Sequence, residues 1–486
     1  MNDGGNFERM LAALPPPDDD IAGAVSPWRR AMRRIVAGYA LTTVTLNFFS
    51  LEYLLPAIGI LLLLLGFRTL RRENPAMRAC FLLACLRTAV FGVTAVCNAC
   101  VLPAAIAEFP AWMANVHAAI VCVQIGCFWR GLAGIREKSG AGQGCPAAGW
   151  LLVWSLGILA LRYLEAEVGV LGLVLLALNA AILVGLWKTA RSMDEAGYAV
   201  TPAPVRLPDA MLTAALVIVT LCGMACGYLF ASRYPMAWAE HTPAPYTDTA
   251  GSLIALGVPA EVLADLTAEE LAAMDGAMRV VGGEVSRTAV DGLYSIDCAV
   301  QLPPVDGRDR WRILHYFVWR EEPGFRGTEA LHIWPTARAN LSWETSGDYT
   351  GRVFCERDGI AMVSPYASFG WERYSSAIHI FGQSSSTDLF AEFSFPKGAE
   401  RCRGYLLYDV LATTEPPYTS IIDSWINYIH QETWAQFPVL TAKENRITRG
   451  WLDDGAFTGA QWAIQFFPYE IADGDAALPK TRFLYS

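Results

Sequence analysis

Charge is scarce in this sequence, and in its second half basic residues are outnumbered by acidic ones. Only 17% of the 486 residues are charged, against about a quarter in an average soluble protein. Residues 235–486 carry 33 acidic side chains against 19 basic ones. Polyphosphate binding requires clustered basic side chains, so this half is a poor match for DNA or RNA, and nucleic acid is excluded as a partner.

Catalytic and metal-binding motifs are also missing. The chain contains no HExxH or GxSxG motif and only six histidines. Four of these lie in residues 277–486 without an HxH or His/Glu spacing: His315, His332, His379 and His430. We predict that they are buried or rim histidines with hydrogen-bonded rings. No catalytic, cofactor or metal residue is assigned, and the sequence favours a protein that is not an enzyme.

Cysteine usage excludes a disulfide scaffold. Nine of the 12 cysteines lie in or beside the apolar first half, and the other three are Cys298, Cys355 and Cys402. Three cysteines form one bridge at most. Cys97 and Cys100 have CxxC spacing, but they lie in an apolar helical run, where cysteine behaves as a small hydrophobe.

Long apolar runs are abundant in the first half. Residues 33–234 are predicted to form seven membrane spans, since a span needs about 20 mostly apolar residues. The predicted spans are residues 33–48, 53–71, 77–102, 113–135, 148–164, 168–188 and 209–232. Residues 35–67 are predicted to form a hairpin with its tip at 47–52; the alternative is one long kinked helix.

Basic residues in the short loops predict the orientation of the spans. Twelve of them fall on one side: Arg29, Arg30, Arg33, Arg34, Arg68, Arg71, Arg72, Arg136, Lys138, Lys188, Arg191 and Arg206. The intervening loops carry none, apart from Arg162 at the border of one. Because basic loops stay in the cytoplasm, we expect a cytoplasmic N-terminus and an extracytoplasmic region after residue 234.

The segments that flank the spans differ in character. Residues 1–32 form an acidic, proline-containing tail without the features of a cleavable signal peptide. Residues 235–276 are predicted to be a linker, rich in Pro, Ala and Thr up to residue 250, followed by a short helical cap. Thr267 with Glu270 three residues later is a capping box, and Gly276 is expected to end that helix.

Residues 277–486 show short runs of Val, Ile, Tyr, Phe and Trp separated by turn residues. This pattern predicts a mainly-β domain, a sandwich or jelly roll. Residues 382–388 (GQSSSTD) are interpreted as a turn. Residues 420–434 fit both helical and strand periodicity, and we favour a helix. The predicted fold class is thus an α-helical polytopic membrane domain followed by a β-rich domain.

Ionisable residues inside a bilayer often mark functional sites, because their energetic cost keeps them rare otherwise. Arg87 is the only charge deep within a predicted span. Its expected partners are Glu52 or Glu108, or helix carbonyl groups. We therefore single out Arg87 and Glu52 as candidate intramembrane functional residues. The other polar candidates are His117, Arg130, Asn98, Gln124 and Asn179, and Arg130 is expected to extend to the membrane surface.

Five segments carry a resemblance to a known group of proteins. PWRRAM (27–32), LNF (46–48), LPAIG (55–59), LGFRTLRREN (65–74) and SWINYIHQ (424–431) resemble an uncharacterised family of bacterial multi-pass membrane proteins with an extracytoplasmic domain. The resemblance implies this architecture in a bacterial plasma membrane, and it implies no activity.

These observations favour a membrane-anchored sensor or regulatory protein. In this hypothesis the external domain binds an envelope ligand, the bundle contacts the lipid bilayer, and the N-terminal tail binds a cytoplasmic protein. Two alternatives remain: a surface protein that binds glycans or the cell wall, and a membrane-anchored hydrolase without a recognisable motif. Nine tryptophans in residues 277–486 suit either sugar stacking or core packing: Trp311, Trp319, Trp334, Trp343, Trp371, Trp425, Trp434, Trp451 and Trp462.

Overall fold

The computed structural model divides into two compact units. It describes residues 26–43, 51–103, 106, 109–140, 142, 144–164, 169–198, 200, 203–336, 342–378, 382–416, 420–449, 453 and 455–468. The first unit comprises residues up to 97 and 107–224, and the second comprises 98–106 and 225–486. Several predictions concern residues outside the described ranges. These residues are most of the tail, the part of the hairpin tip before residue 51, His379 and Trp451.

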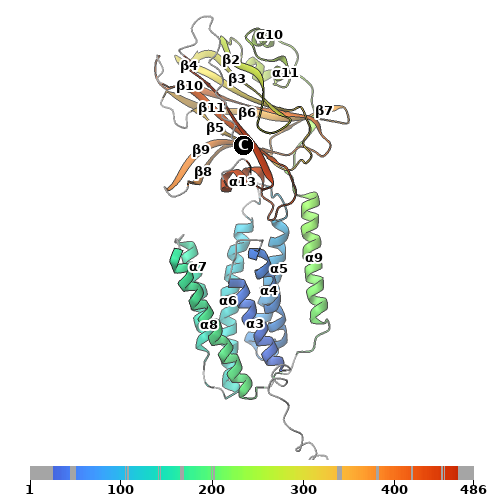
Figure 1. Cartoon of the computed structure of the whole chain (residues 1–486), viewed down its shortest axis with the longest axis vertical. Helices are drawn as coiled ribbons and strands as arrows, with labels where there is room; N and C mark the ends of the chain where they lie inside the picture. Colours follow the sequence, from blue (N-terminus) through green and yellow to red (C-terminus); the bar gives the residue numbers. More distant parts are fainter. Residues whose placement is uncertain are drawn as a thin grey trace, which may run out of the picture. The chain divides into compact units, whose positions relative to one another are not determined.

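The first unit is a bundle of long helices (Figure 1). They are α3 (Pro27–Thr43), α4 (Leu51–Leu70), α5 (Pro75–Cys97), α6 (Phe109–Lys138), α7 (Pro146–Tyr163), α8 (Gly169–Glu195) and α9 (Asp209–Phe230), whose last turns belong to the second unit. Six of them, α4 to α9, are long and apolar enough to cross a membrane. The predicted polytopic membrane domain is therefore present. The helix α3, with 17 residues, is not among the six, so the count of seven spans stays a prediction.

Glycines bring α3 and α4 together as an antiparallel pair. A Cβ atom at Gly59 would lie 2.8 Å from the carbonyl oxygen of Gly38, and one at Gly66 would lie 3.0 Å from that of Ala31. Small residues allow this close approach of two backbones in a membrane. Residues 27–43 and 51–70 are thus two helices, as the hairpin interpretation expected, and not one long helix.

The start of α3 differs from the prediction. The helix begins at Pro27, so PWRRAM forms its first turns instead of the end of the tail. Proline suits the first turn of a helix because no intrahelical partner exists there for a backbone N–H. Trp28 is buried, and its Nε1 donates to the carbonyl oxygen of Ala190 in α8 at 3.0 Å. That contact explains why the helix begins before the apolar run.

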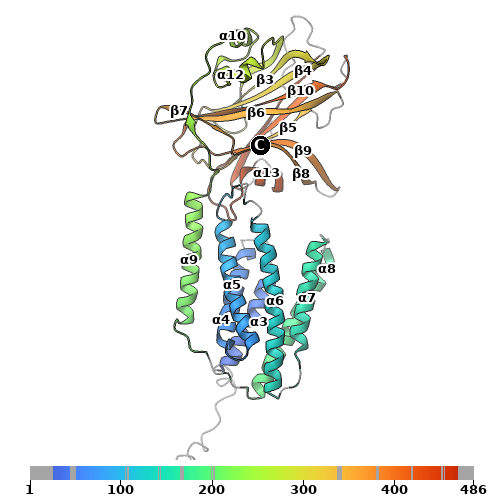
Figure 2. The ribbon, with the colours of Figure 1, turned by 180° about the vertical axis from the view of Figure 1, so that it is seen from behind.

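The helices α4, α5, α6 and α7 lie side by side in chain order, and α8 returns to contact α3 and α7 (Figure 2). In contrast, α9 presents most of its side chains outward, and only 6% of its apolar window is buried. It stands beside α5 and makes few contacts with the other helices. This loose attachment leaves room between the two helices.

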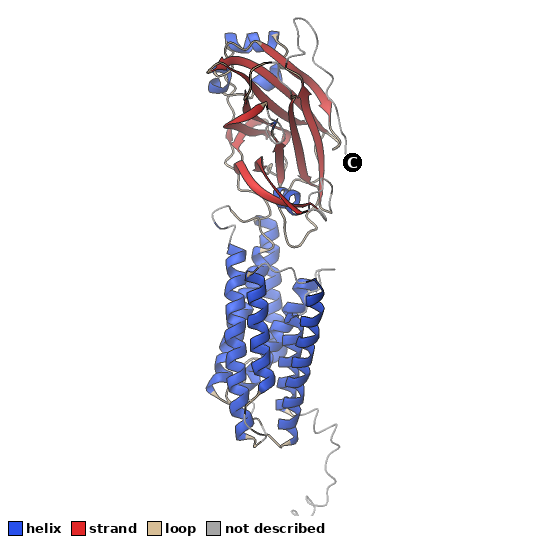
Figure 3. Ribbon diagram, turned by 90° about the vertical axis from the view of Figure 1, so that its left-hand side faces the viewer, coloured by secondary structure: helices blue, strands red, loops and turns tan. Residues whose placement is uncertain are grey.

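The second unit is mainly β structure in two layers (Figure 3). Its strands are β1 (Ala239–Glu240), β2 (Arg279–Arg287), β3 (Leu293–Val305), β4 (Arg308–Trp319), β5 (Glu329–Trp334), β6 (Trp343–Arg357), β7 (Ile360–Pro365), β8 (Ser368–Ile378), β9 (Gly382–Phe393), β10 (Glu400–Ala412), β11 (Ile422–Gln431) and β12 (Phe457–Phe466). One sheet has the order β1-β7-β6-β10-β4-β3-β2, and the other has the order β12-β11-β5-β9-β8. All pairs are antiparallel, which agrees with the predicted sandwich class. The short helix α13 (Ala442–Arg449) contacts the five-stranded sheet.

The helical preference for residues 420–434 was wrong, because residues 422–431 form the strand β11. This strand pairs with β12 on one edge and with β5 on the other. Ile422, Ile426 and Tyr428 belong to the core between the sheets, and their spacing satisfies the period of two in a strand. Residues 382–388 were also misassigned, since they belong to β9 instead of a turn.

Short helices and their capping residues cover the outer face of the seven-stranded sheet. They are α10 (Asp248–Ala255), α11 (Ala260–Leu263) and α12 (Ala268–Ala272). The predicted capping box is confirmed: Thr267 Oγ1 accepts from the Glu270 backbone N–H at 3.0 Å, and Glu270 Oε2 accepts from the Thr267 N–H at 2.8 Å. The predicted linker is more ordered than expected, because it contains β1 and the start of α10.

Candidate functional site

A buried polar cluster surrounds Arg87 in the bundle. The side chain is 3% exposed. Its Nε donates to Nε2 of His117 at 3.3 Å, and its Nη1 donates to Oε1 of Gln124 at 3.1 Å. Gln124 in turn donates from Nε2 to the carbonyl oxygen of Cys80 at 3.1 Å. Arg87, His117 and Gln124 were separate candidates in the sequence, and they form one hydrogen-bonded network between α5 and α6.

The carboxylates expected near Arg87 are not its partners in the described part of the chain. Glu52 lies in the first turn of α4, and its buried Oε2 has no hydrogen-bond partner among the described residues. Glu108 lies outside those residues. Arg87 is thus solvated by neutral groups, which stabilise a cation less than a carboxylate would. Arg130 is exposed on α6, and its extension to the membrane surface stays a prediction.

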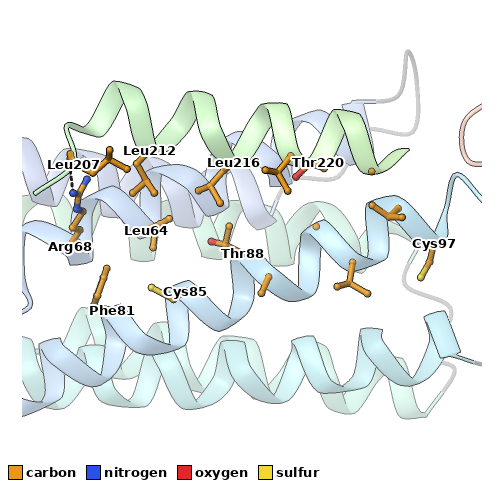
Figure 4. Close-up of a pocket in the computed structure, with 16 residues that line it drawn as sticks. Leu64, Arg68, Phe81, Cys85, Thr88, Cys97, Leu207, Leu212, Leu216 and Thr220 are labelled. Carbon is orange, nitrogen blue, oxygen red and sulfur yellow. Dashed lines mark hydrogen bonds between the residues drawn. The ribbon is translucent and has the colours of Figure 1, made fainter. Parts of the chain in front are cut away.

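A second feature of the bundle is an apolar groove of about 720 Å³ between α4, α5 and α9 (Figure 4). Its walls include Phe81, Val93, Leu212 and Leu216, and Arg68 is the single charged side chain that lines it. The sequence did not predict this groove, because neither hydropathy nor spacing shows how far one span lies from the next.

In the β unit, each described histidine of the predicted set contacts a carboxylate. His315 Nδ1 lies 2.7 Å from Asp297, His332 Nε2 lies 2.8 Å from Asp388, and His430 Nδ1 lies 2.7 Å from Glu329. All three rings are buried, as predicted. No group of three or more His, Cys, Asp or Glu side chains in the described ranges could hold a metal ion.

The His315 pair continues into a serine and has the connectivity of a catalytic triad. His315 Nε2 lies 2.7 Å from Ser424 Oγ, and Trp462 Nε1 donates to Asp297 at 3.0 Å. Tyr408 OH donates to the same Ser424 Oγ at 2.6 Å. Burial raises the pKa of Tyr408 to about 12, so its hydroxyl keeps the donated proton at neutral pH.

This network lies inside the sandwich, where a substrate cannot reach it. Ser424 is 0% exposed, and Asp297 and His315 are each 1% exposed. A nucleophile needs space for the reacting carbonyl and for oxyanion donors about 3 Å away. The Ser424 hydroxyl instead has protein partners on both sides. The arrangement therefore joins β3, β4 and β10 of one sheet to β11 of the other as a satisfied polar network.

His430 differs from the other two histidines because it lines a cavity. The cavity has a volume of about 510 Å³ and is bordered by Asp291, Trp319, Phe325 and Glu432, among others. The His430 ring lies 5.0 Å from the Trp319 ring. Nδ1 is held by Glu329, whereas Nε2 has no hydrogen-bond partner within the described ranges. In His315 and His332, by contrast, both ring nitrogens are bonded.

The cavity residues come from segments far apart in the sequence. The β2–β3 turn supplies Asp291, the end of β4 supplies Trp319, and the end of β11 supplies His430. The pairing of β11 with β5 places His430 opposite Glu329. Glu329 has no signal in the sequence that links it to His430, since 101 residues separate the two and no local spacing connects them.

The tryptophans lie mostly in the interior. Trp311, Trp319, Trp343 and Trp462 are buried in the main core. Trp334 and Trp425 form a partly buried pair with ring centroids 6.3 Å apart, and Trp434 is 68% exposed. Core packing thus accounts for half of the eight described tryptophans, and a flat platform of exposed rings is not seen among them.

The comparisons with known proteins identify no family. No family model matches the chain, and no curated protein matches it. Thirteen chains of solved structures match. One of them comes from a structure titled "AvmM Catalyzes Macrocyclization in Alchivemycin A Biosynthesis", with 12% identity over 37% of this chain and 94% of that chain and a TM-score of 0.19. A similarity at that TM-score carries no information about the activity of this chain.

Proposed function

We propose that this protein is a membrane-anchored binding protein of the sensor type, whose β unit takes a small ligand in the His430 cavity. The observation that carries the proposal is a buried histidine that lines a 510 Å³ cavity with one ring nitrogen oriented by Glu329 and the other without a partner in the described chain. Cavities of about 300–1,000 Å³ are typical of small-molecule sites.

The lining defines the chemistry of the ligand. His430 Nδ1 is hydrogen-bonded to Glu329, so Nε2 is the ring nitrogen that remains for a polar group of the ligand. Asp291 and Glu432 add negative charge at the cavity, and Phe325 adds an apolar surface. A small hydroxylated or cationic molecule matches these groups.

The proposed orientation is a cytoplasmic N-terminus and an extracytoplasmic β unit. The support is the twelve basic residues that fall on one side of the predicted spans, together with the resemblance to bacterial multi-pass proteins. In this proposal the bundle contacts lipid and the N-terminal tail binds a cytoplasmic partner. The rival function, a surface protein that binds glycans or the cell wall, is favoured only by the exposed Trp434. Deletion of residues 8–28 distinguishes the two functions. The deletion should change the cellular output of a sensor, whereas it should leave the function of a surface-binding protein unchanged.

Cysteine accessibility tests the orientation. Asp358 in the β6–β7 turn and Glu195 at the end of α8 are both exposed. In a background without the native cysteines, we expect Asp358→Cys to react with a membrane-impermeant maleimide in intact cells. Glu195→Cys is expected to react only after permeabilisation, because basic loops remain in the cytoplasm. The opposite pattern would place the β unit in the cytoplasm and end the proposal of an external sensor.

Acylation with diethyl pyrocarbonate tests whether the cavity admits small molecules. The reagent requires a free, neutral imidazole nitrogen. We expect His430 to react at least about tenfold faster than His315 or His332, which become free only through local unfolding. Peptide mass spectrometry of the full chain in detergent gives the three rates. A compound that binds the cavity should slow the reaction at His430 alone, and equal rates at all three histidines would contradict the proposed binding site.

A further inference from the structure

The groove between α4, α5 and α9 is bounded at each end by a contact of α9 with a neighbouring helix. At one end, a Cβ atom at Gly223 would meet Val96 of α5 at 2.7 Å, so these two helices touch there. At the other end, Arg68 of α4 donates to Asp209 at the start of α9. Between these contacts lies the volume of about 720 Å³, which Leu64, Cys85 and Leu216 line from the three helices (Figure 4).

The groove wall is suited to a hydrocarbon chain. Its side chains are almost all apolar, and the hydroxyl of Thr88 already donates to the carbonyl oxygen of Ala84 at 2.8 Å. Val93 and Val219 border the groove and are exposed. An unfilled gap loses the dispersion contacts of its lining atoms. In a bilayer, the nearest material that can restore these contacts is an acyl chain.

One end of the groove carries excess positive charge. Asp209 is shared by Arg68 at 2.9 Å and Arg34 at 2.7 Å, so one carboxylate faces two guanidinium groups. Arg71 donates to the carbonyl oxygen of Pro204 at 2.7 Å, and its guanidinium lies 5.5 Å from the ring of Phe81 in the groove wall. Arg72, the next residue in the chain, is exposed. Basic pockets between membrane helices favour anionic headgroups.

We propose that this groove binds one anionic phospholipid, with an acyl chain between α5 and α9 and its phosphate at Arg71 and Arg72. The site is separate from the His430 cavity and does not depend on the ligand proposed there. The occupant would lie against α9, the helix that leads along the chain into β1 and the β unit. The lipid would then complete the packing that α9 lacks on its own.

Native mass spectrometry of the full chain in a mild detergent tests the proposal. The probes are phosphatidylglycerol and phosphatidylcholine with identical acyl chains. We expect retention of one phosphatidylglycerol with a preference of about 30-fold, since each arginine near an anionic surface contributes about fivefold. The double variant Arg71→Gln/Arg72→Gln should reduce the preference to nearly one. The control Arg191→Gln, which removes an exposed arginine paired with Glu195, should keep the preference.

A variant that fills the groove tests the position of the chain. Gly92→Phe should abolish lipid retention because its ring occupies the gap. Gly157→Phe in α7 is the matched control, since a Cβ atom there has no neighbour within 4 Å and the residue does not line the groove. Equal retention of the two lipids by the unchanged protein overturns the proposal. So does undiminished retention by a folded Gly92→Phe variant. If Gly92→Phe does not fold, the lipid preference of the Arg71→Gln/Arg72→Gln variant still tests the proposal.

Discussion

Replacement of Asp265 by alanine is expected to destabilise the β unit by about 3–5 kcal/mol, the usual cost of removing one member of a buried ion pair. Asp265 accepts from Arg403 Nε at 2.7 Å and from Arg403 Nη2 at 2.9 Å. It also accepts from Tyr316 OH at 2.9 Å, and the carboxylate is 3% exposed. Without Asp265, the half-buried Arg403 guanidinium lacks the carboxylate that neutralises its charge.

The same carboxylate attaches the helical cap to the sheet. Asp265 lies between α11 and α12, whereas Arg403 belongs to β10 and Tyr316 to β4. Glu270 makes a second connection, because its Oε2 accepts from Tyr405 OH at 2.5 Å. We therefore expect Asp265→Ala to increase hydrogen exchange in residues 248–276 before the rest of the β unit.

Denaturant unfolding followed by tryptophan fluorescence of the full chain measures this effect. The control is Asp291→Ala, which removes an exposed carboxylate paired with Arg287. Such an exposed pair is screened by water and contributes little to stability. A loss of less than about 1 kcal/mol for Asp265→Ala would show that the cap is held by its apolar contacts alone.

Replacement of Asp297 by alanine is expected to cost about 2–6 kcal/mol, because it leaves two buried donors unpaired at about 1–3 kcal/mol each. The donors are His315 Nδ1 and Trp462 Nε1, at 2.7 and 3.0 Å from the carboxylate. Both rings are buried within the β unit. Thermal unfolding of the full chain in detergent measures the loss.

Substitution of Ser424 distinguishes a structural role of this network from a catalytic one. If Ser424 is a packing residue, Ser424→Ala lowers the free energy of unfolding by about 1–3 kcal/mol, because His315 Nε2 and Tyr408 OH lose their partner. A hydrolase predicts the reverse: the variant stays stable and loses ester hydrolysis. Val300→Ala is the matched control for buried truncation, since Val300 is 1% exposed in the separate cap core.

Much of the architecture was predictable from local properties. Apolar runs long enough to span a bilayer identified α4 to α9, and the capping box at Thr267 was found at its expected position. The strand pattern after residue 277 also predicted the two-layered β class. The assignment of residues 422–431 failed because a period of two and a helical period both fit that short segment. Pairing with β5 and β12 decided it.

The candidate sites were much less predictable. Arg87 was singled out correctly as a buried charge, yet its expected carboxylate partner was wrong for Glu52. The four histidines were noticed individually, and of the three that the structure describes, His430 lines the cavity. Its importance depends on Glu329, Trp319 and Asp291, which lie on other strands and turns. No sequence spacing records such neighbours, because strand order in an antiparallel sheet is set by long-range pairing.

The sequence by itself determined that the chain divides into an apolar helical part and a β part, because hydropathy and periodicity are properties of consecutive residues. Only the tertiary structure decided which side chains meet. In the folded protein, the network of Asp297, His315 and Ser424 is buried between the two sheets. His430 lines a cavity, and its Nδ1 is bonded to Glu329. The tertiary structure also places a groove between α4, α5 and α9. The physical reason is that hydrogen bonds and cavities depend on distances between atoms from remote segments, and folding alone sets those distances.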